Sequence, residues 1–367
     1  MLLDPRVERM ATTITRYSLG VQPGWMVTVN AGPAAMPLVL AFYTAVLEAG
    51  AHPFVLSEIP GAAEILLAEG SEQQLTYADP YRLYMVEKSD AVLRILSEEN
   101  TRSTSNTDPV LLGLQKKGQA PISAGFSRRI AEARPHCLTL FPTQAYAQDA
   151  EMSLSEFEDF VFRACFVDGD GDPAERWREL SREQQRIVDW LAGKHNVIVE
   201  GRRTDLSFSI EGRTFINSDG KRNFPSGEVF TSPVHETVEG TIYFDYPSSY
   251  NGRTVQGVEL AFEGGVVTRA SAQAGEDFLK AMLDLDPGAR RLGEFAIGTN
   301  AGVDRITRNV LFDEKIAGTI HCALGNAYPN AGGTNTSAIH WDIVKDMREG
   351  RVVVDGETLY ENGKFAI

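Results

Sequence analysis

Two short glycine-rich segments in the second half of the chain carry histidines beside other side chains that bind metals. His321 lies in the segment 318–328, and His340 is followed two positions later by Asp342. In an extended strand, residues i and i+2 lie on the same face, so His340 and Asp342 can reach one metal ion. Imidazole and carboxylate together suit Zn, Mn, Co or Fe better than Ca or Mg. This spacing predicts a transition-metal site.

Two glutamates upstream could complete such a site. Glu228 follows Gly227 and Glu294 follows Gly293, both in sequences typical of tight turns. A glycine beside a ligand lets the backbone approach closely and directs the carboxylate. Each pattern alone is common in proteins, but the combination of two His, one Asp and two Glu in one half of the chain favours a metal centre.

The elements expected around these residues are mostly strands. Leu206, Phe208 and Ile210 alternate with polar residues, which is the period of a half-buried strand. Gly264-Gly265 predicts a hairpin turn between two further strands. Further strands are expected at 197–200, 241–245, 258–262 and 266–270. The sequence therefore predicts a β-rich α+β C-terminal domain over residues 194–367 that holds the metal.

In the first half of the chain, the expected strands alternate with helices. Asp4 and Pro5 predict the start of a helix that ends at Gly20. A strand, helix and strand are expected at 25–29, 36–48 and 53–56, a helix at 91–98, a loop at 100–108 and a strand at 138–141. This βαβ pattern predicts a Rossmann-like α/β N-terminal domain with a largely parallel sheet over residues 1–193. The turn at 30–35 lacks G-x-G-x-x-G, so we expect a scaffold without a nucleotide fingerprint and no organic cofactor.

The acidic run Asp168-Gly-Asp170-Gly-Asp172 resembles a calcium loop. Pro173 occupies the position where such a loop needs a glycine with positive φ, and proline fixes φ near −65°. We expect instead that Asp172 caps a helix over 174–192 and that Pro173 opens it. Ser153 and Glu156 form a capping box that predicts another helix.

Composition limits the partners. The 367 residues include 35 Lys and Arg against 50 Asp and Glu, a formal net charge of −15. This balance argues against nucleic acid and against an anionic membrane surface. No apolar run approaches a membrane span, and the N-terminus lacks the features of a signal peptide. Three scattered cysteines, Cys137, Cys165 and Cys322, predict free thiols and a cytoplasmic location.

Several segments together resemble one family. They are Tyr17–Gly24, Phe157–Asp168, Asn217–Pro233, Gly293–Asn300, Leu311–His321 and His340–Asp342. Over nearly its whole length the chain resembles the aminopeptidase T / aminopeptidase S family of dinuclear metallo-aminopeptidases. The segment 329–339 is shorter than in other members, which bears on the shape of the substrate pocket.

The resemblance implies a ligand set. Matched motif by motif, it consists of Glu228, Glu294, His321, Tyr328, His340 and Asp342. These residues would hold two divalent ions, Zn, Co or Mn, whose charge three carboxylates largely offset. A coordinating cation favours the phenolate of tyrosine, whose ordinary pKa is about 10. Two such ions can share a bridging hydroxide as nucleophile and polarise the scissile carbonyl.

A general base should be a carboxylate near the metals that is not itself a ligand. Glu314, seven residues before His321, is the candidate. Its other interpretation is a carboxylate at the surface or in a hairpin.

The expected function is a metal-dependent aminopeptidase that releases N-terminal residues from peptides, with hydrophobic or broad preference. The resemblance also implies a homodimer. One alternative is a mononuclear Fe(II) ring-cleaving dioxygenase of related fold, which would need only His321, His340 and Asp342 and has no use for the other ligands. A second alternative is a non-catalytic binding protein that keeps the fold, and a third is a nucleotide-binding role for the first half.

Overall fold

The computed structural model describes residues 4–250 and 252–367. The chain divides into two compact units. The first comprises 1–176 and 220–225, and the second comprises 177–219 and 226–367. None of the described helices combines the length and the apolar composition that a membrane crossing requires.

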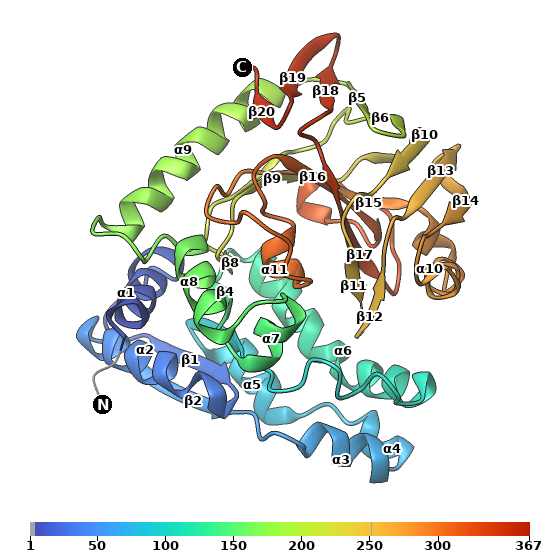
Figure 1. Cartoon of the computed structure of the whole chain (residues 1–367). Coiled ribbons are helices and arrows are strands. Elements are labelled where there is room, and N and C mark those ends of the chain that lie inside the picture. The colour runs from blue at the N-terminus through green and yellow to red at the C-terminus, as the bar shows by residue number, and fades with distance from the viewer. Residues whose placement is uncertain (1–3, 251) are drawn as a thin grey trace. The chain divides into compact units, whose positions relative to one another are not determined.

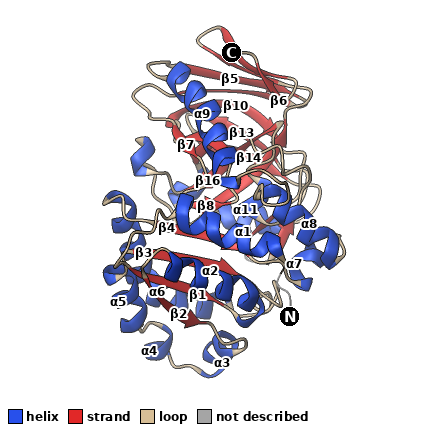
Figure 2. Cartoon of the chain, turned by 90° about the vertical axis from the view of Figure 1, so that its left-hand side faces the viewer, coloured by secondary structure: helices blue, strands red, loops and turns tan. Residues whose placement is uncertain are grey.

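The first unit is built on a five-stranded parallel sheet in the order β2-β1-β3-β4-β8 (Figure 2). Its strands are β1 (Met26–Ala31), β2 (His52–Ser57), β3 (Ala91–Leu96), β4 (His136–Leu140) and β8 (Asn223–Phe224). Its helices are α1 (Pro5–Thr13), η1 (Ile14–Ser18), η2 (Pro33–Ala35), α2 (Met36–Glu48), α3 (Ala62–Glu69), α4 (Glu72–Leu75), α5 (Pro80–Lys88), α6 (Pro109–Ala131), α7 (Gln144–Asp149) and α8 (Leu154–Ala164).

The strand order explains the helix layers. The chain runs from β1 to β2 through α2, and then crosses β1 to reach β3 through α5. Because such crossovers are right-handed, this reversal places α2 on one face of the sheet and α5 and α6 on the other. In agreement, α2 packs against α1, and α5 packs against α6. The expected α/β fold of the first half is confirmed.

The prediction of a helix at 91–98 is wrong, because residues 91–96 form the central strand β3. Ala91, Val92, Leu93 and Ile95 are all buried. A parallel strand covered on both faces is apolar along its length and lacks the alternation of a half-buried strand. Such a run cannot be told from a buried helix by periodicity alone.

The expected helix starts are confirmed by their hydrogen bonds. The Asp4 side chain accepts from the backbone N–H of Arg6, and Asp172 accepts from that of Ala174 at 3.0 Å. Ser153 and Glu156 make both bonds of a capping box at the start of α8.

The second unit contains two antiparallel sheets (Figure 1). The eight-stranded sheet has the order β14-β13-β10-β6-β5-β18-β19-β20, and the five-stranded sheet has the order β17-β16-β15-β9-β7. The strands of the first are β5 (Asn196–Gly201), β6 (Thr204–Ser209), β10 (Val234–Tyr243), β13 (Glu259–Glu263), β14 (Val266–Ser271), β18 (Arg351–Val354), β19 (Glu357–Glu361) and β20 (Lys364–Phe365). The strands of the second are β7 (Ile216–Ser218), β9 (Glu228–Thr231), β15 (Leu292–Gly298), β16 (Thr319–Gly325) and β17 (His340–Asp346).

Shorter elements complete this unit. They are the hairpin of β11 (Ser248–Tyr250) and β12 (Arg253–Val255), the helices α10 (Glu276–Leu283) and α11 (Val310–Asp313), and the turns η3 (Pro287–Arg290) and η4 (Pro329–Ala331). One continuous hydrophobic core joins the two sheets, and Phe208 of β6 packs against Phe295 of β15 with ring centroids 5.0 Å apart. The predicted hairpin turn at Gly264-Gly265 is present, with φ of 56° and 75°.

The long helix α9 (Pro173–Leu191) begins in the first unit and continues in the second. Ile187 and Leu191 near its end belong to the core of the second unit. The compact units therefore change at 176/177, within α9. The domain ranges 1–193 and 194–367 stay a prediction.

Candidate metal centre

Four adjacent strands of the five-stranded sheet carry five of the predicted ligands. Glu228 begins β9, Glu294 is in β15, His321 is in β16, and His340 and Asp342 are in β17. In the antiparallel register Glu294 pairs with Ala323, which pairs in turn with Asp342. Pairing between distant segments thus brings together side chains that are up to 114 positions apart in sequence.

The sheet has a site face and a core face. The small residues Ala296, Gly298, Ala323 and Gly325 alternate with the core residues of β15 and β16, so they share the face of the ligands. They leave room there for long acidic and imidazole side chains. The opposite face is apolar and belongs to the core; it includes Phe295, Ile297, Ile320, Cys322, Leu324, Trp341 and Ile343. Cys322 is therefore directed away from the site.

Glycine is required beside both glutamates. Gly227 has φ of 116°, and a Cβ there would lie 2.7 Å from the Cβ of Asn300. A Cβ on Gly293 would lie 2.3 Å from the backbone oxygen of Asn326. Both contacts are closer than a real side chain tolerates, which confirms that glycine permits the close backbone approach at these ligands.

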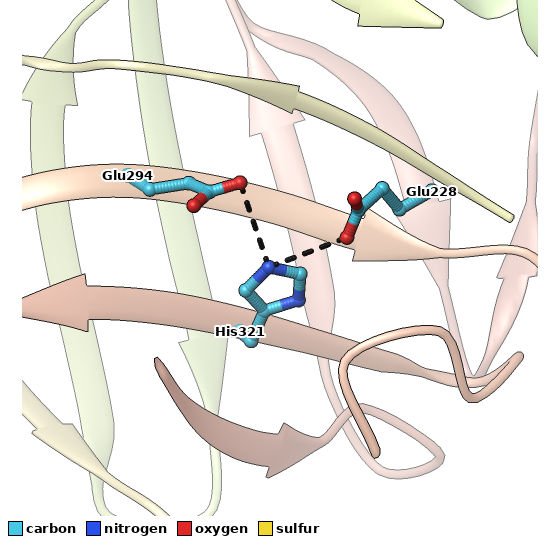
Figure 3. Close-up of side chains that lie close together, drawn as sticks. All are labelled: Glu228, Glu294 and His321. Carbon is cyan, nitrogen blue, oxygen red and sulfur yellow. Dashed lines mark ion pairs between the residues drawn. The ribbon is translucent and has the colours of Figure 1, made fainter. Parts of the chain in front are cut away.

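His321 lies at the middle of the cluster and is fully buried. Its Nε2 atom is 3.5 Å from Glu228 Oε2, 3.7 Å from Glu294 Oε1 and 3.9 Å from Asp342 Oδ1. Figure 3 shows Glu228 and Glu294 approaching this imidazole from two different strands. Three carboxylates and one imidazole thus converge on one small volume.

His340 forms the second part of the cluster. Its Nε2 atom lies 3.1 Å from Glu294 Oε2, 3.6 Å from Asp342 Oδ1 and 3.3 Å from the hydroxyl of Tyr328. Tyr328 also packs edge-on against the His340 ring, with centroids 5.0 Å apart. Glu294 therefore faces both imidazoles, with a different oxygen toward each.

Glu314 follows α11 and is close to the same cluster. A carboxylate oxygen of Glu314 and one ligand atom each of His321 and Asp342 lie within 4.8 Å of one another. Glu314 also accepts a hydrogen bond from the ammonium of Lys315. The structure thus brings all seven predicted site residues together, and the role of Glu314 as the general base stays a prediction.

Two further residues support the site and were not predicted. Lys315 is fully buried and donates to Glu228 Oε1 at 2.5 Å. Gln184 in α9 is also fully buried and donates to the backbone oxygen of Glu228 at 2.9 Å. No spacing in the sequence indicates either contact, because both depend on how distant segments pack.

The cluster shifts the pKa values of its own groups. Burial lowers the pKa of His321, but the carboxylates of Glu294, Glu228 and Asp342 outweigh it and raise the pKa to about 9. Burial likewise opposes a raised pKa at His340, where Asp342 and Glu294 raise it to about 10. Burial raises the pKa of Glu294, yet the two imidazoles lower it to about 2.

The pKa values of two other groups, Glu314 and Tyr328, are raised in the metal-free protein. Burial raises the pKa of Glu314 to about 8, and the nearby carboxylates of Glu228 and Asp342 add to this shift while Lys315 opposes it. Burial and the surrounding carboxylates raise the pKa of Tyr328 well above its ordinary value. A cation among these groups would reverse the shift of the phenol, because it favours the phenolate.

The donor set fits divalent transition-metal ions. Four buried polar atoms of these side chains make no hydrogen bond: Glu228 Oε2, Asp342 Oδ1 and both ring nitrogens of His321. Buried polar atoms are normally paired, and leaving one unpaired costs about 1–3 kcal/mol. The ligand atoms of Glu228, Glu294 and His321 lie within 4.8 Å of one another, as do those of Glu294, His340 and Asp342. Mixed imidazole and carboxylate donors suit Zn, Mn, Co or Fe.

Solved structures show the same fold. The wild-type AmpT from Thermus thermophilus matches with a TM-score of 0.86 and 24% identity over 99% of each chain. A 2,5-dihydroxypyridine dioxygenase from Pseudomonas putida matches with a TM-score of 0.64 and 14% identity, over 98% of this chain and 96% of the other.

Relatives also match along the sequence. Aminopeptidase 2 of Geobacillus stearothermophilus is 28% identical over 409 aligned positions, which cover 99% of this chain and 98% of the relative. Aminopeptidase T of Thermus thermophilus is 28% identical over 97% of this chain and 95% of its own length. The model of the thermophilic metalloprotease (M29) family matches residues 3–365. The chain therefore belongs to the thermophilic metalloprotease (M29) family.

Proposed function

We propose that this protein is a metal-dependent aminopeptidase that releases N-terminal residues from peptides through a dinuclear site. Its ligands would be Glu228, Glu294, His321, Tyr328, His340 and Asp342. Membership of a metalloprotease family supports the hydrolysis of peptide bonds. The names of the two full-length relatives support the aminopeptidase activity. We expect a hydrophobic or broad preference for the residue that is released.

One observation carries the proposal of two ions. Glu294 directs Oε1 toward His321 and Oε2 toward His340, so it belongs to two separate groups of possible ligands. A carboxylate that faces two imidazoles with different oxygens is suited to bridge two ions. Glu228 and His321 would hold one ion, His340 and Tyr328 would hold the other, and Asp342 lies within 4 Å of both imidazoles.

The chain's own groups would carry the rest of the reaction. Divalent ions at such a site act as Lewis acids and lower the pKa of bound water toward neutrality. Glu314 would accept the proton from the attacking water and later pass it to the departing amine. Burial of the cluster strengthens these electrostatic interactions, because water does not screen them. A free amino terminus of the peptide can bind one ion or a nearby carboxylate, which would account for exopeptidase specificity.

The activity is tested by metal analysis together with peptide cleavage. We expect about two divalent ions per chain and hydrolysis of Leu-p-nitroanilide and of a panel of dipeptides. Glu314→Gln should keep its metal content and lower kcat by about 10²–10⁴-fold, the usual contribution of a general base. Near-normal kcat in that variant would remove Glu314 from this role. Metal-loaded wild-type protein that cleaves none of these substrates would favour a non-catalytic binding protein.

The structural likeness to the dioxygenase supports the second candidate, an Fe(II) ring-cleaving enzyme. That reaction would need one ion held by His321, His340 and Asp342. The additional convergence of Glu228, Glu294 and Tyr328 favours the peptidase. One Fe(II) per chain and oxygen uptake with a dihydroxypyridine would establish the dioxygenase instead.

We further propose a homodimer in the cytoplasm. Helix α2 exposes Met36, Leu40, Tyr43 and Leu47, which recur every three or four residues and so form an apolar stripe. Contiguous exposed apolar surface of this kind often marks a protein interface. Sedimentation of a Leu40→Glu/Leu47→Glu variant should show monomers, and an unchanged mass would contradict this surface. The three cysteines are buried thiols, which supports a reducing compartment.

A further inference from the structure

Lys315 places a positive charge among the acidic groups of the candidate site. Its side chain is fully buried, and its ammonium donates to Oε1 of both Glu228 and Glu314. A buried ammonium is costly unless it is paired. Lys315 is therefore a fixed cation between a predicted ligand and the predicted base.

The contact with Lys315 leaves Glu228 with one free oxygen. Oε1 accepts from the lysine at 2.5 Å, whereas Oε2 is buried, makes no hydrogen bond and lies 3.5 Å from His321 Nε2. Only Oε2 is thus directed at the volume where the donors converge. Without the lysine, both oxygens of Glu228 would be available to a cation.

Glu314 has two competing roles in this geometry. Its distances to His321 and Asp342 would also suit a metal ligand. A carboxylate that coordinates an ion is not free to accept a proton from water. The ammonium of Lys315 occupies one oxygen of Glu314 and satisfies part of its charge. The contact with Lys315 therefore favours the role of Glu314 as a general base over its role as a metal ligand.

We propose that Lys315 is a positioning residue that keeps Glu314 out of the metal coordination shell and limits Glu228 to one coordinating oxygen. This inference rests on the proposed function, in which Glu228 is a ligand and Glu314 is the base. A merely structural ion pair would stabilise the fold without affecting how the ions are coordinated.

The chain offers a matched control for this distinction. Lys345 in β17 is equally buried and donates to Asp245 at 3.2 Å and to the backbone oxygen of Tyr243 at 3.1 Å. Its partners are not among the site residues. Lys345→Met therefore removes a buried lysine and its ion pair without altering the proposed coordination shell.

The test uses Co²⁺ as the probe, because Co²⁺ absorbs visible light more weakly as its coordination number rises. Full-length protein is loaded with Co²⁺ as wild type, Lys315→Met, Lys345→Met, Glu314→Gln and the double variant Lys315→Met/Glu314→Gln. We expect weaker absorption in Lys315→Met and a kcat lowered by about 10²-fold or more, because Glu314 becomes a ligand. The double variant should recover only the part of the absorption that coordination by Glu314 removes, because the second oxygen of Glu228 stays available, and it should not regain the activity. Lys345→Met and Glu314→Gln should keep the wild-type spectrum.

Two results would overturn the inference. One is a Lys315→Met spectrum identical to that of wild type at full Co²⁺ occupancy. The other is an altered spectrum in Glu314→Gln alone, since this would show that Glu314 already coordinates the ion beside an intact Lys315. The second result decides the question even if Lys315→Met does not fold. Wild-type protein that takes up no Co²⁺ would instead contradict the proposed function itself, and with it the role of Lys315.

Discussion

The Nδ1 atom of His340 lies 2.7 Å from the backbone carbonyl oxygen of Asn326. A carbonyl oxygen can only accept, so Nδ1 carries the proton and the neutral ring keeps its lone pair on Nε2. That nitrogen faces Glu294, Asp342 and the hydroxyl of Tyr328. The chain between β16 and β17 thus fixes the tautomer and the orientation that a metal ligand needs.

His340→Ala should abolish peptide hydrolysis and lower the metal content while the fold is kept. Disturbing only the groups that orient a ligand costs about 10–100-fold in affinity, so losing the ligand itself should cost about 100-fold or more. Metal analysis and circular dichroism check both expectations. His195→Ala is the control, because the His195 side chain is 55% exposed and is not one of the predicted site residues. Full activity in His340→Ala would contradict the site assignment.

Tyr328→Phe tests whether the phenolate oxygen of Tyr328 contributes to metal binding. The Phe side chain keeps the edge-on packing against His340 and the contact with Phe230, whose ring lies 5.2 Å away, so stability should change by less than about 1 kcal/mol. Loss of the oxygen should weaken metal binding by about tenfold or more. Calorimetric titration with Mn²⁺ measures the difference, and Tyr360→Phe, at another buried tyrosine of the same unit, is the control. Unchanged affinity would mean that Tyr328 serves only to pack against His340.

Local patterns predicted much of the fold. Helix α2 has the bounds 36–48 expected from its apolar spacing, and α9 differs from its prediction by one residue at each end. The 23-residue helix α6 was not predicted, because Pro121 and three glycines interrupt its pattern. One of them, Gly118, is required by packing, since a Cβ there would lie 2.5 Å from the backbone oxygen of Leu75. Such tertiary demands are not visible in local propensity.

The site was predicted only in part from spacing. His340 and Asp342 share a face because they are two positions apart in one strand, and this is a local property. The approach of Glu228 to His321 depends on the register of β9 on β15 and of β15 on β16. No local signal sets that register, so the full ligand set followed from the family resemblance. Lys315 was missed because a single lysine gives no sign of burial.

The metal-free protein should lose stability as pH rises from about 6.5 to 10. The pKa values of His321 and His340 are raised from 6.5 to about 9 and about 10. Groups with raised pKa values stabilise the fold fully below the unfolded value, and this contribution disappears as pH passes the folded values. Metal binding needs the neutral imidazoles, so the affinity for Mn²⁺ should rise over the same window and binding should release protons.

Melting temperatures of EDTA-treated and Mn²⁺-loaded protein between pH 6.5 and 10 check this prediction. The gap between the two curves should widen with pH. His340→Asn removes one of the groups with a raised pKa, so its metal-free form should show a shallower decline than the wild type. Parallel curves for the loaded and metal-free wild type would show that the imidazoles are already neutral before metal binds.

Gly227→Ala should disturb the metal centre through the backbone. A methyl group at a φ of 116° is strained, and it would also meet the Cβ of Asn300 at 2.7 Å. Together these effects should destabilise the protein by about 2–4 kcal/mol. Because Glu228 is the next residue and Gly227 accepts from the backbone N–H of Thr299 at 2.9 Å, the shift should also reach the carboxylate and lower metal occupancy.

Gly264→Ala separates the backbone strain of Gly227→Ala from its steric clash. Gly264 also has positive φ, 56°, but a methyl group there would have no other atom within 4 Å, and the residue belongs to a hairpin turn between β13 and β14. This variant should lose about 1 kcal/mol through backbone strain and keep its metal. Urea denaturation and metal analysis of both variants measure the contrast. If Gly227→Ala lost stability but kept full metal occupancy, the glycine would serve packing alone and would not position Glu228.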